Sequence, residues 1–535
     1  MAALACLSLW AAPAPIMAPW DVFILLDGGY RIMAGQAPGT DFANPIGPLT
    51  YGLVSLGMRL ESVPSLAAVS YGGVIFLPVV AVLAWRVSRV RLPAGYAAAF
   101  TVFLAVVVVA VRPLGYSPRT TTYAMLYNRY GWALYGILLL LVLLRPRRPG
   151  PPRAVIGAGL TLGVLLGLLF YCKISFLVAG LVAATLGWAL GTLPRRPSLW
   201  LAAAAGFGAV ATAMRLLFGV RVTHYLADLD SAAGAQDARQ RMALLAHTII
   251  DTTPVWLTTL VVLGSLYVAA RGCAARPDPR LPVAVLYILG SCVLIAAGDA
   301  PERGQLPALV VAGLLLVAHL KYTLPRWAGG PRRPVLARRR PTQLPTLLPV
   351  LLAVLLAAAT GPIVGRDALA LGKSMALRGY VAQPPAGQRL DGERLRDFVI
   401  PANSRWATAY RTANEVPAMI NDGLAVLRRH VAAGDTVFTV ALTDPFSFAL
   451  SLPPNRGGPL WWDLGFDFDR TTHPDAEQLL GHTEWVMVPL MTPGQGCCQE
   501  TVRVMLDLYG PYLAAHFTEA ERTSNWILLS RTSSG

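Results

Sequence analysis

The residues best suited to chemistry lie near the N-terminus, between two apolar stretches. Three carboxylates, Asp21, Asp27 and Asp41, and the guanidinium of Arg31 fall within the segment 20–51. A carboxylate can accept the proton of a hydroxyl group, and a cation can hold an anionic group. The segment ends in glycine and proline residues that a membrane-spanning helix does not favour. It is either a reactive loop at a membrane face or an interfacial loop with ordinary solvated acids, and composition does not separate these interpretations.

The elements around this segment are strongly apolar. The chain has 535 residues, of which 55% are hydrophobic and only 14% are charged, and its mean hydropathy is +0.52. Apolar runs of about 17 to 22 residues, each long enough to cross a bilayer, recur up to Pro362 and then stop. The sequence therefore predicts a transmembrane domain over residues 1–365, with an acidic first loop at 20–64, and a globular C-terminal domain over residues 366–535.

The basic residues indicate how the chain crosses the membrane. Although the formal net charge is +16, nucleic-acid binding is not indicated, because no basic face with interleaved aromatic residues is present. The basic clusters instead lie between apolar runs, at residues 86–91, 145–153, 195–196, 271–280 and 321–340. Lys and Arg near span ends are retained in the cytoplasm. We therefore expect a multi-pass protein of the cytoplasmic (inner) membrane whose first loop and C-terminal domain are extracytoplasmic, on the periplasmic face.

The apolar runs predict about eleven transmembrane helices. Residues 1–19 fit a first span or a signal peptide, and the absence of Lys or Arg before Arg31 favours the span. Residues 47–60 are expected to form an interfacial helix. The remaining spans are predicted at residues 65–85, 94–111, 131–144, 154–171, 174–191, 198–218, 248–270, 282–297, 306–322 and 346–364.

The C-terminal residues alternate between helix and strand patterns. Helical spacing is found at 414–431 and 501–512, and short apolar runs typical of buried strands are found at 436–442, 485–490 and 526–530. This alternation predicts an α/β layer of about three to five strands. The segment 444–469 is aromatic, acidic and rich in proline, which suits either a glycan-facing lid or an irregular packed connection.

Further candidate residues lie on the predicted outer face. Tyr127 and Arg129 belong to a segment rich in Tyr, Thr and Arg, and Lys173 lies in a short turn between two spans. Tyrosines at span ends commonly form an interfacial belt, and a lysine there commonly extends to the lipid head groups. Lys173 is the stronger candidate, because a cation at the rim of the membrane requires an anionic partner.

The residues of the first loop form a recognisable arrangement. Asp21 stands at the outer end of the first apolar helix and is followed by Gly35, by Asp41–Phe42 and by Pro48–Leu49. This arrangement resembles the integral-membrane GT-C glycosyltransferases, which include protein O-mannosyl, aminoarabinose and related polyprenyl-phosphate-dependent transferases. The rest of the chain is similar only in architecture. The chain departs from the family where an acidic pair often follows the first helix, because Val22 stands beside Asp21.

The resemblance implies a reaction and a set of roles. A GT-C enzyme of this kind moves a sugar from a polyprenyl-phosphate donor to a lipid, glycan or protein acceptor at the outer face. Asp21 is then the expected base, and Asp41 is the second catalytic candidate, which orients the acceptor or binds a divalent metal such as Mg²⁺ or Mn²⁺. The expected substrate-binding residues, several of them cations suited to the donor phosphate, are Lys173, Arg129, Arg303, Asp27, Tyr127 and Glu302.

Two other function classes remain open from the sequence. A transporter would show related halves and ionisable residues within its spans, and we find neither an internal repeat nor such charges. A non-catalytic membrane assembly protein has no need of the loop carboxylates. The Asp467–Asp469 pair has the spacing of a nucleotide-sugar site, but it lies on the wrong side of the membrane for nucleotide sugars. Convergence of Asp21 and Asp41 with the cations would favour the enzyme.

Overall fold

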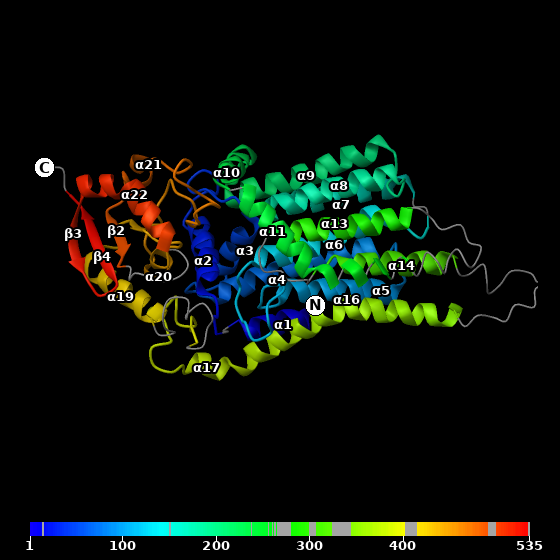
Figure 1. Ribbon diagram of the computed structural model, residues 1–535, viewed down its shortest axis with the longest axis horizontal. Coiled ribbons are helices and arrows are strands. Elements are labelled where there is room, and N and C mark those ends of the chain that lie inside the picture. Colours follow the sequence, from blue (N-terminus) through cyan, green and yellow to red (C-terminus); the bar gives the residue numbers. More distant parts are fainter. Residues whose placement is uncertain are drawn as a thin grey trace, which may run out of the picture.

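The computed structural model places a long helical bundle at one end of the molecule and a small sheet at the other, with α2 (Pro19–Met33) between them (Figure 1). The residues described are 1–12, 15–148, 151–236, 238–254, 256–258, 260, 261, 264, 280–298, 306–323, 344–401, 415–490 and 499–532. Within this part of the chain, five helices are long and apolar enough to cross a membrane. The protein is thus a polytopic α-helical membrane protein.

The five helices that meet the length and composition of a span are α4 (Ala67–Ser88), α6 (Leu126–Leu143), α7 (Pro152–Cys172), α9 (Pro197–Phe218) and α13 (Arg280–Ala297). The other helices of this part are α1 (Ala2–Ala11), α3 (Leu49–Met58), α5 (Ala94–Val109), α8 (Ile174–Ala189), α10 (Val222–Ala235), α11 (Ala238–Asp251), α14 (Leu309–Thr323), α16 (Leu344–Ala376) and α17 (Arg378–Ala382). Helices α3 to α9, α13, α14 and α16 overlap the predicted helices, whereas α1 ends well before residue 19 and α10 was not predicted. Part of the span predicted at 248–270 lies outside the described residues. The total of about eleven spans stays a prediction.

The pair α7 and α9 shows how the bundle packs. A Cβ added at Gly163 would lie 1.8 Å from the carbonyl oxygen of Ala203, and one added at Gly159 would lie 2.3 Å from that of Leu199. A Cβ on Gly206 of α9 would in turn lie 2.4 Å from the carbonyl oxygen of Leu160. Small residues four positions apart allow two helix backbones to approach closely, which is the usual basis of helix association within a bilayer.

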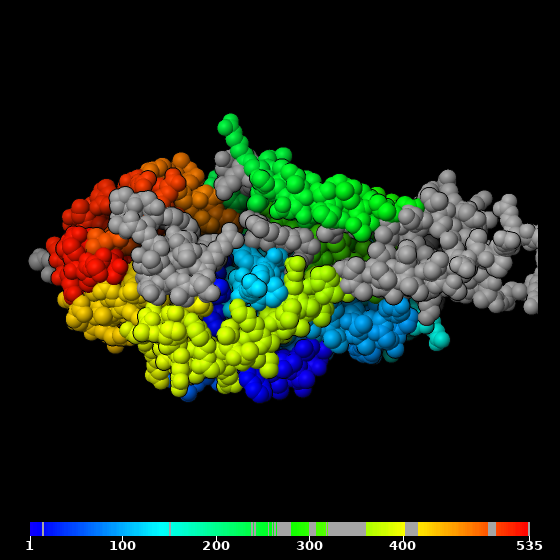
Figure 2. All heavy atoms as spheres, turned by 60° about the horizontal axis from the view of Figure 1, so that its bottom comes forward, coloured from blue at the N-terminus to red at the C-terminus, as the bar shows by residue number. Residues whose placement is uncertain are grey.

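A buried ion-pair triad ties α16 to the segment after α5. Asp367 of α16 lies 2.8 Å from Nε of Arg112 and 2.9 Å from Nη2 of Arg129, and all three side chains are buried. Nearby, the Lys373 ammonium donates to the carbonyl of Arg119, and Figure 2 shows that segment in light blue against the yellow-green end of α16. This connection fixes the end of the bundle from which the chain continues toward the sheet.

The C-terminal residues form an α/β unit. Its sheet has the order β1-β2-β4-β3, with β1 (Val437–Thr439) parallel to β2 (Trp485–Pro489) and antiparallel pairings between β2 and β4 (Trp526–Arg531) and between β4 and β3 (Phe517–Arg522). The helices are α19 (Glu415–His430), α20 (Phe446–Leu450), α21 (Ala476–Leu480) and α22 (Gln499–His516). The predicted strands correspond to β1, β2 and β4. Strand β3 was not predicted, because its polar residues Thr518, Glu519 and Glu521 interrupt the apolar pattern of a strand.

The aromatic segment 444–469 is a packed connection. Trp461 and Trp462 are each only 5% exposed. The Trp462 ring contacts Phe468, with ring centroids 5.0 Å apart, and Tyr509, with centroids 5.8 Å apart. Because these indole faces are covered, they do not offer a stacking surface to a sugar ring, and of the two interpretations of the segment the packed connection holds.

Candidate active site

The helix α2 places Asp21 at the junction between the bundle and the α/β unit. Pro19 begins the helix, where its fixed φ suits the first turn, and Asp21 lies in that first turn, where a negative charge is favoured. The sequence interpretation had treated this stretch as a loop. It folds as a helix because Gly28 and Gly29 let it pack closely on α3, where a Cβ on Gly28 would lie 2.5 Å from Cδ1 of Tyr51.

Two carboxylates of the α/β unit belong to the same electrostatic network as Asp21. Asp463 interacts electrostatically with both Asp21 and Asp467, and Asp467 and Asp21 both interact with Tyr51 of α3. The backbone N–H of Asp463 donates to Oδ2 of Asp467 over 3.3 Å, whereas Oδ1 of Asp467 is buried without a hydrogen-bond partner. The cluster of Asp21, Asp463, Asp467 and Tyr51 thus combines residues from α2, α3 and the segment after β1.

Burial makes these carboxyl groups better bases than exposed ones. It raises the pKa of Asp21 from 3.8 to about 6, and the nearby negative charge of Asp463 adds to that rise. Burial and Asp463 likewise raise the pKa of Asp467 well above its usual value. At neutral pH, Asp21 is then mostly ionised and still takes up a proton more readily than an ordinary carboxylate, which is the condition for a general base.

Lys173 lies at the turn between α7 and α8. Its side chain is 9% exposed, and its ammonium nitrogen lies 5.5 Å from the centre of the Tyr127 ring. The same turn touches the first loop, because a Cβ on Gly47 would lie 2.6 Å from the carbonyl oxygen of Tyr171. Gly47 precedes α3, the helix that carries Tyr51, so the first loop connects the Lys173 turn to the carboxylate cluster.

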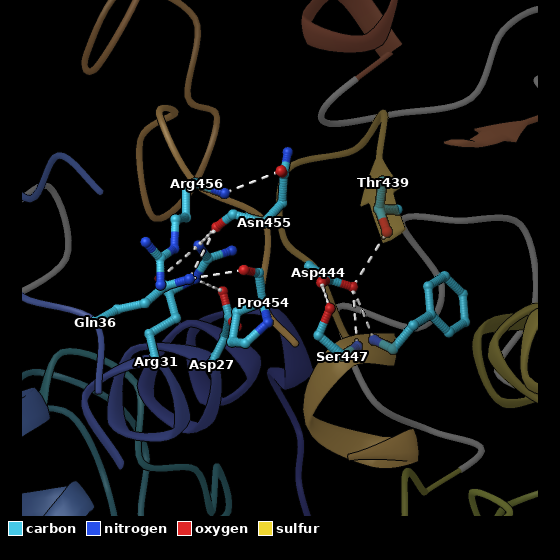
Figure 3. A network of polar contacts seen from close by, with 10 residues as sticks. Asp27, Arg31, Gln36, Thr439, Asp444, Ser447, Pro454, Asn455 and Arg456 are labelled. Carbon is cyan, nitrogen blue, oxygen red and sulfur yellow. Dashed lines mark hydrogen bonds and ion pairs between the residues drawn. The ribbon is translucent and has the colours of Figure 1, made fainter. Parts of the chain in front are cut away.

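Asp27 lies nearly two turns before the end of α2, in a different polar network (Figure 3). Its Oδ2 accepts from Nε of Arg31 over 2.8 Å, and both side chains are buried. Burial raises the pKa of Asp27 against the opposing attraction of Arg31. Arg31 in turn donates to the carbonyl oxygen of Asn455, in the segment that leads to Asp463.

Asp41 lies on the pairing between the first loop and the α/β unit. Its Oδ2 accepts from the backbone N–H of Ala37 over 2.7 Å, and its Oδ1 lies 3.5 Å from Nη1 of Arg456. Its carbonyl oxygen accepts from the N–H of Gly457 over 2.8 Å. These contacts hold the first loop in place, and they do not bring the Asp41 carboxylate into the Asp21 cluster.

The other expected site residues have different surroundings. Arg129 is held by Asp367 and by the carbonyl of Val107 at 2.8 Å, so the structure does not place it beside Asp21. Tyr127 lies beneath Lys173, and Glu302 and Arg303 lie outside the described residues. Asp463 and Asp467 were missed as site residues. The acidic composition of their segment was the available signal, but the sequence does not reveal that this segment folds back onto α2.

Within the described part of the chain, no group of three or more His, Cys, Asp or Glu residues is arranged to hold a metal ion. The reaction proposed below therefore includes no metal.

A separate cavity of ≈ 450 Å³ opens at the end of α2 opposite Asp21, where Tyr30, Gln36, Arg456 and His482 line it.

Comparison with known proteins gives little beyond this geometry. The chain matches no known protein family, and no curated protein sequence matches it. Among solved structures it is similar to the crystal structure of ArnT from Cupriavidus metallidurans bound to undecaprenyl phosphate. That alignment covers 100% of this chain and 97% of the other, at 13% sequence identity and a TM-score of 0.46. Similarity at this level does not establish a common fold or a common activity.

Proposed function

We propose that the protein is a membrane-embedded glycosyltransferase that moves a sugar from a polyprenyl-phosphate donor to a hydroxyl-bearing acceptor, with Asp21 as the general base. The observation that carries the proposal is the Asp21 cluster. A half-buried carboxyl group whose pKa is raised to about 6 lies at the junction of a helical bundle and a polar unit, and the carboxylate of Asp463 interacts with it electrostatically. Strongly shifted carboxyl groups at such junctions are typical of acid–base catalysis.

The reaction assigns a role to each charged group. The acceptor hydroxyl gives its proton to the Asp21 carboxylate while its oxygen forms a bond to the anomeric carbon of the sugar. The bond between that carbon and the phosphate oxygen breaks, and its electron pair leaves with the polyprenyl phosphate. Lys173 is the proposed ligand of the phosphate, because it is the cation at the turn that adjoins the first loop.

A lipid-linked donor fits the position of these groups better than a soluble one. Lys173 joins two apolar helices, α7 and α8, and is largely buried at their ends. A phosphate carried on a prenyl chain is held at the level of the head groups, where a lysine at a helix end also lies. Asp41, which is bonded to the 456–460 segment, is proposed to hold the first loop in place.

The test is transfer by the purified protein in lipid nanodiscs, supplied with a panel of polyprenyl-phosphate monosaccharides and a membrane lipid extract as acceptor. Release of polyprenyl phosphate is measured for the wild type and for Asp21→Asn, which keeps the size of the side chain but removes the base. We expect a loss of roughly 100-fold or more in kcat. The wild-type kcat/KM should fall as pH drops through about 6, since protonation of Asp21 removes the acceptor of the proton.

Stability measurements separate lost chemistry from lost folding. Folding raises the pKa of Asp21 from 3.8 to about 6, so its contribution to stability is greatest below the lower value and declines as pH rises through that interval. The uncharged Asp21→Asn variant should therefore melt no lower than the wild type at neutral pH. If Asp21→Asn kept full activity and Asp41→Asn lost it, the base would be Asp41. If neither change affected transfer, the enzymatic proposal would be wrong.

A further inference from the structure

The helix α2 and the segment 454–468 of the α/β unit lie against each other in opposite directions. The C-terminal end of α2, with Arg31, is bonded to the start of that segment at Asn455. The N-terminal end of α2, with Asp21, faces the other end of the segment, where Asp463 interacts with it electrostatically. The position of the segment relative to α2 is therefore set in part by how the segment is fixed at its start, and in part by the hydrogen bond from the N–H of Trp462 to the carbonyl of Leu442 at 2.8 Å.

The fixed point at the start of the segment is a buried polar network (Figure 3). Arg31 contacts Asp27 at 2.8 Å and donates to the carbonyl of Asn455. Gln36, just past α2, donates to the carbonyl of Pro454 over 2.7 Å. The residues Asp27, Arg31 and Gln36 are 1%, 6% and 3% exposed, so water does not compete for their hydrogen bonds.

The same network reaches into the α/β unit. The side-chain amide of Asn455 donates to the carbonyl of Leu479 over 3.1 Å, and its oxygen accepts from the Thr483 hydroxyl over 3.1 Å. From Asn455 the segment pairs with the first loop, through the N–H of Ala43 to the carbonyl of Gly458 at 3.0 Å and the N–H of Leu460 to the carbonyl of Ala43 at 2.9 Å. The segment is thus held continuously from Asn455 to Leu460, directly before the carboxylates.

We propose that Asp27 is a positioning residue that acts through Arg31: it orients the guanidinium that holds Asn455, and so fixes the segment carrying Asp463 and Asp467 opposite Asp21. This inference rests on the proposed function for its effect on catalysis. Without the Asp27 carboxylate, the buried guanidinium loses a bonded counter-charge and turns toward water, and the contact with Asn455 is weakened. The carboxylates of the segment then move away from Asp21, and Asp21 becomes more hydrated.

The kinetic test compares Asp27→Asn with the wild type in the transfer assay with a polyprenyl-phosphate sugar. A small displacement of groups around a reacting centre can lower kcat by roughly 100-fold, so we expect a loss of about tenfold to 100-fold. The KM for the donor should change by less than about threefold, because Lys173 and not this network holds the donor. The pH below which kcat/KM falls should move below 6. Burial and the charge of Asp463 raise the pKa of Asp21, and both effects weaken when the segment moves away. Asp27→Glu, which keeps the charge, should recover part of the lost activity.

Asp367→Asn is the matched control. It also breaks a buried carboxylate–arginine pair, but on α16, away from α2 and the 454–468 segment. It should lower the melting temperature and leave the pH below which kcat/KM falls as it is in the wild type. If Asp27→Asn merely lowered the melting temperature in the same way, with kcat and that pH unchanged, Asp27 would be an ordinary structural residue and the proposal would be wrong.

Hydrogen exchange tests the positioning without any activity. Amides of residues 456–468 should exchange faster in Asp27→Asn than in the wild type or in Asp367→Asn, and unchanged exchange in that segment overturns the proposal whatever the reaction is. Faster exchange together with full activity of Asp21→Asn would instead reject the glycosyltransferase and keep the positioning. If Asp27→Asn does not fold, Gln36→Ala serves as the milder variant, because it removes the contacts of the Gln36 amide with Pro454, Asn455 and Arg31 but leaves the Asp27–Arg31 pair. It should show the same change to a smaller extent.

Discussion

At the scale of single residues, Lys173 is a cation whose surroundings limit what it can do. Only 9% of it is exposed, and its ammonium lies over the face of Tyr127. A lysine that simply extends to the head groups tolerates Arg, Gln or Met, because water and many lipids replace its contacts. A lysine that holds a donor phosphate does not, because a charge-assisted contact is lost together with its geometry.

We therefore predict that Lys173→Met weakens donor binding by roughly 1.5 to 3 kcal/mol while the protein remains folded. The dependence of turnover on the concentration of the polyprenyl-phosphate sugar, measured in nanodiscs with protein level and melting temperature alongside, checks this. Lys173→Arg, which keeps the charge, is the comparison. An unchanged donor dependence in well-folded Lys173→Met would assign Lys173 to the head groups.

The sequence could identify single residues of the site only where a local pattern marked them. Asp21 and Lys173 stand at the ends of apolar runs, where any charge is conspicuous, and their roles stay predictions. Arg129 was equally conspicuous, but its partner Asp367 belongs to a helix far along the chain. Ion pairing between helices that are far apart in the chain leaves no local sequence pattern. For the same reason, the sequence did not show that the segment with Asp463 and Asp467 folds back onto α2.

At the scale of elements, the spans follow from hydropathy, but their close packing depends on single glycines. We predict that Gly163→Ala destabilises the bundle by about 1 to 3 kcal/mol, because the new methyl group would overlap the Ala203 carbonyl and force α7 away from α9. Thermal unfolding in detergent measures the change. Gly208→Ala on α9 is the control, since a Cβ there meets nothing within 4 Å. Equal melting temperatures of the two variants would contradict the close packing.

The helix α2 is an element near the proposed site that local patterns did not predict. Its residues include Asp21, Asp27, Arg31 and two adjacent glycines, which in isolation disfavour an apolar helix. Its stability comes from tertiary contacts, in which the glycines admit Tyr51 and Val54 of α3. Tertiary packing therefore overrides local propensity at the point where Asp21 must be held.

At the scale of the whole molecule, the basic clusters define an orientation that remains a prediction. The loops at 86–93, 145–153, 192–197, 271–281 and 321–345 should face the cytoplasm, and residues from about 366 onward should face outward. A phosphatase fused at Gly535 should be active and a cytoplasmic reporter at the same position inactive. The opposite pattern would reverse the orientation and place the Asp21 cluster in the cytoplasm, away from a donor presented at the outer face.

The span of chain between Arg31 and Asn455 has a consequence for biogenesis. The two residues are separated by 424 positions, so a ribosome completes and inserts the bundle long before the segment bearing Asp463 is made. During that interval Asp21 lies next to water, and its carboxyl group has the acidity of any exposed aspartate. The proposed base would therefore be completed last, and a chain released before the α/β unit is finished would carry the helical bundle without the proposed site.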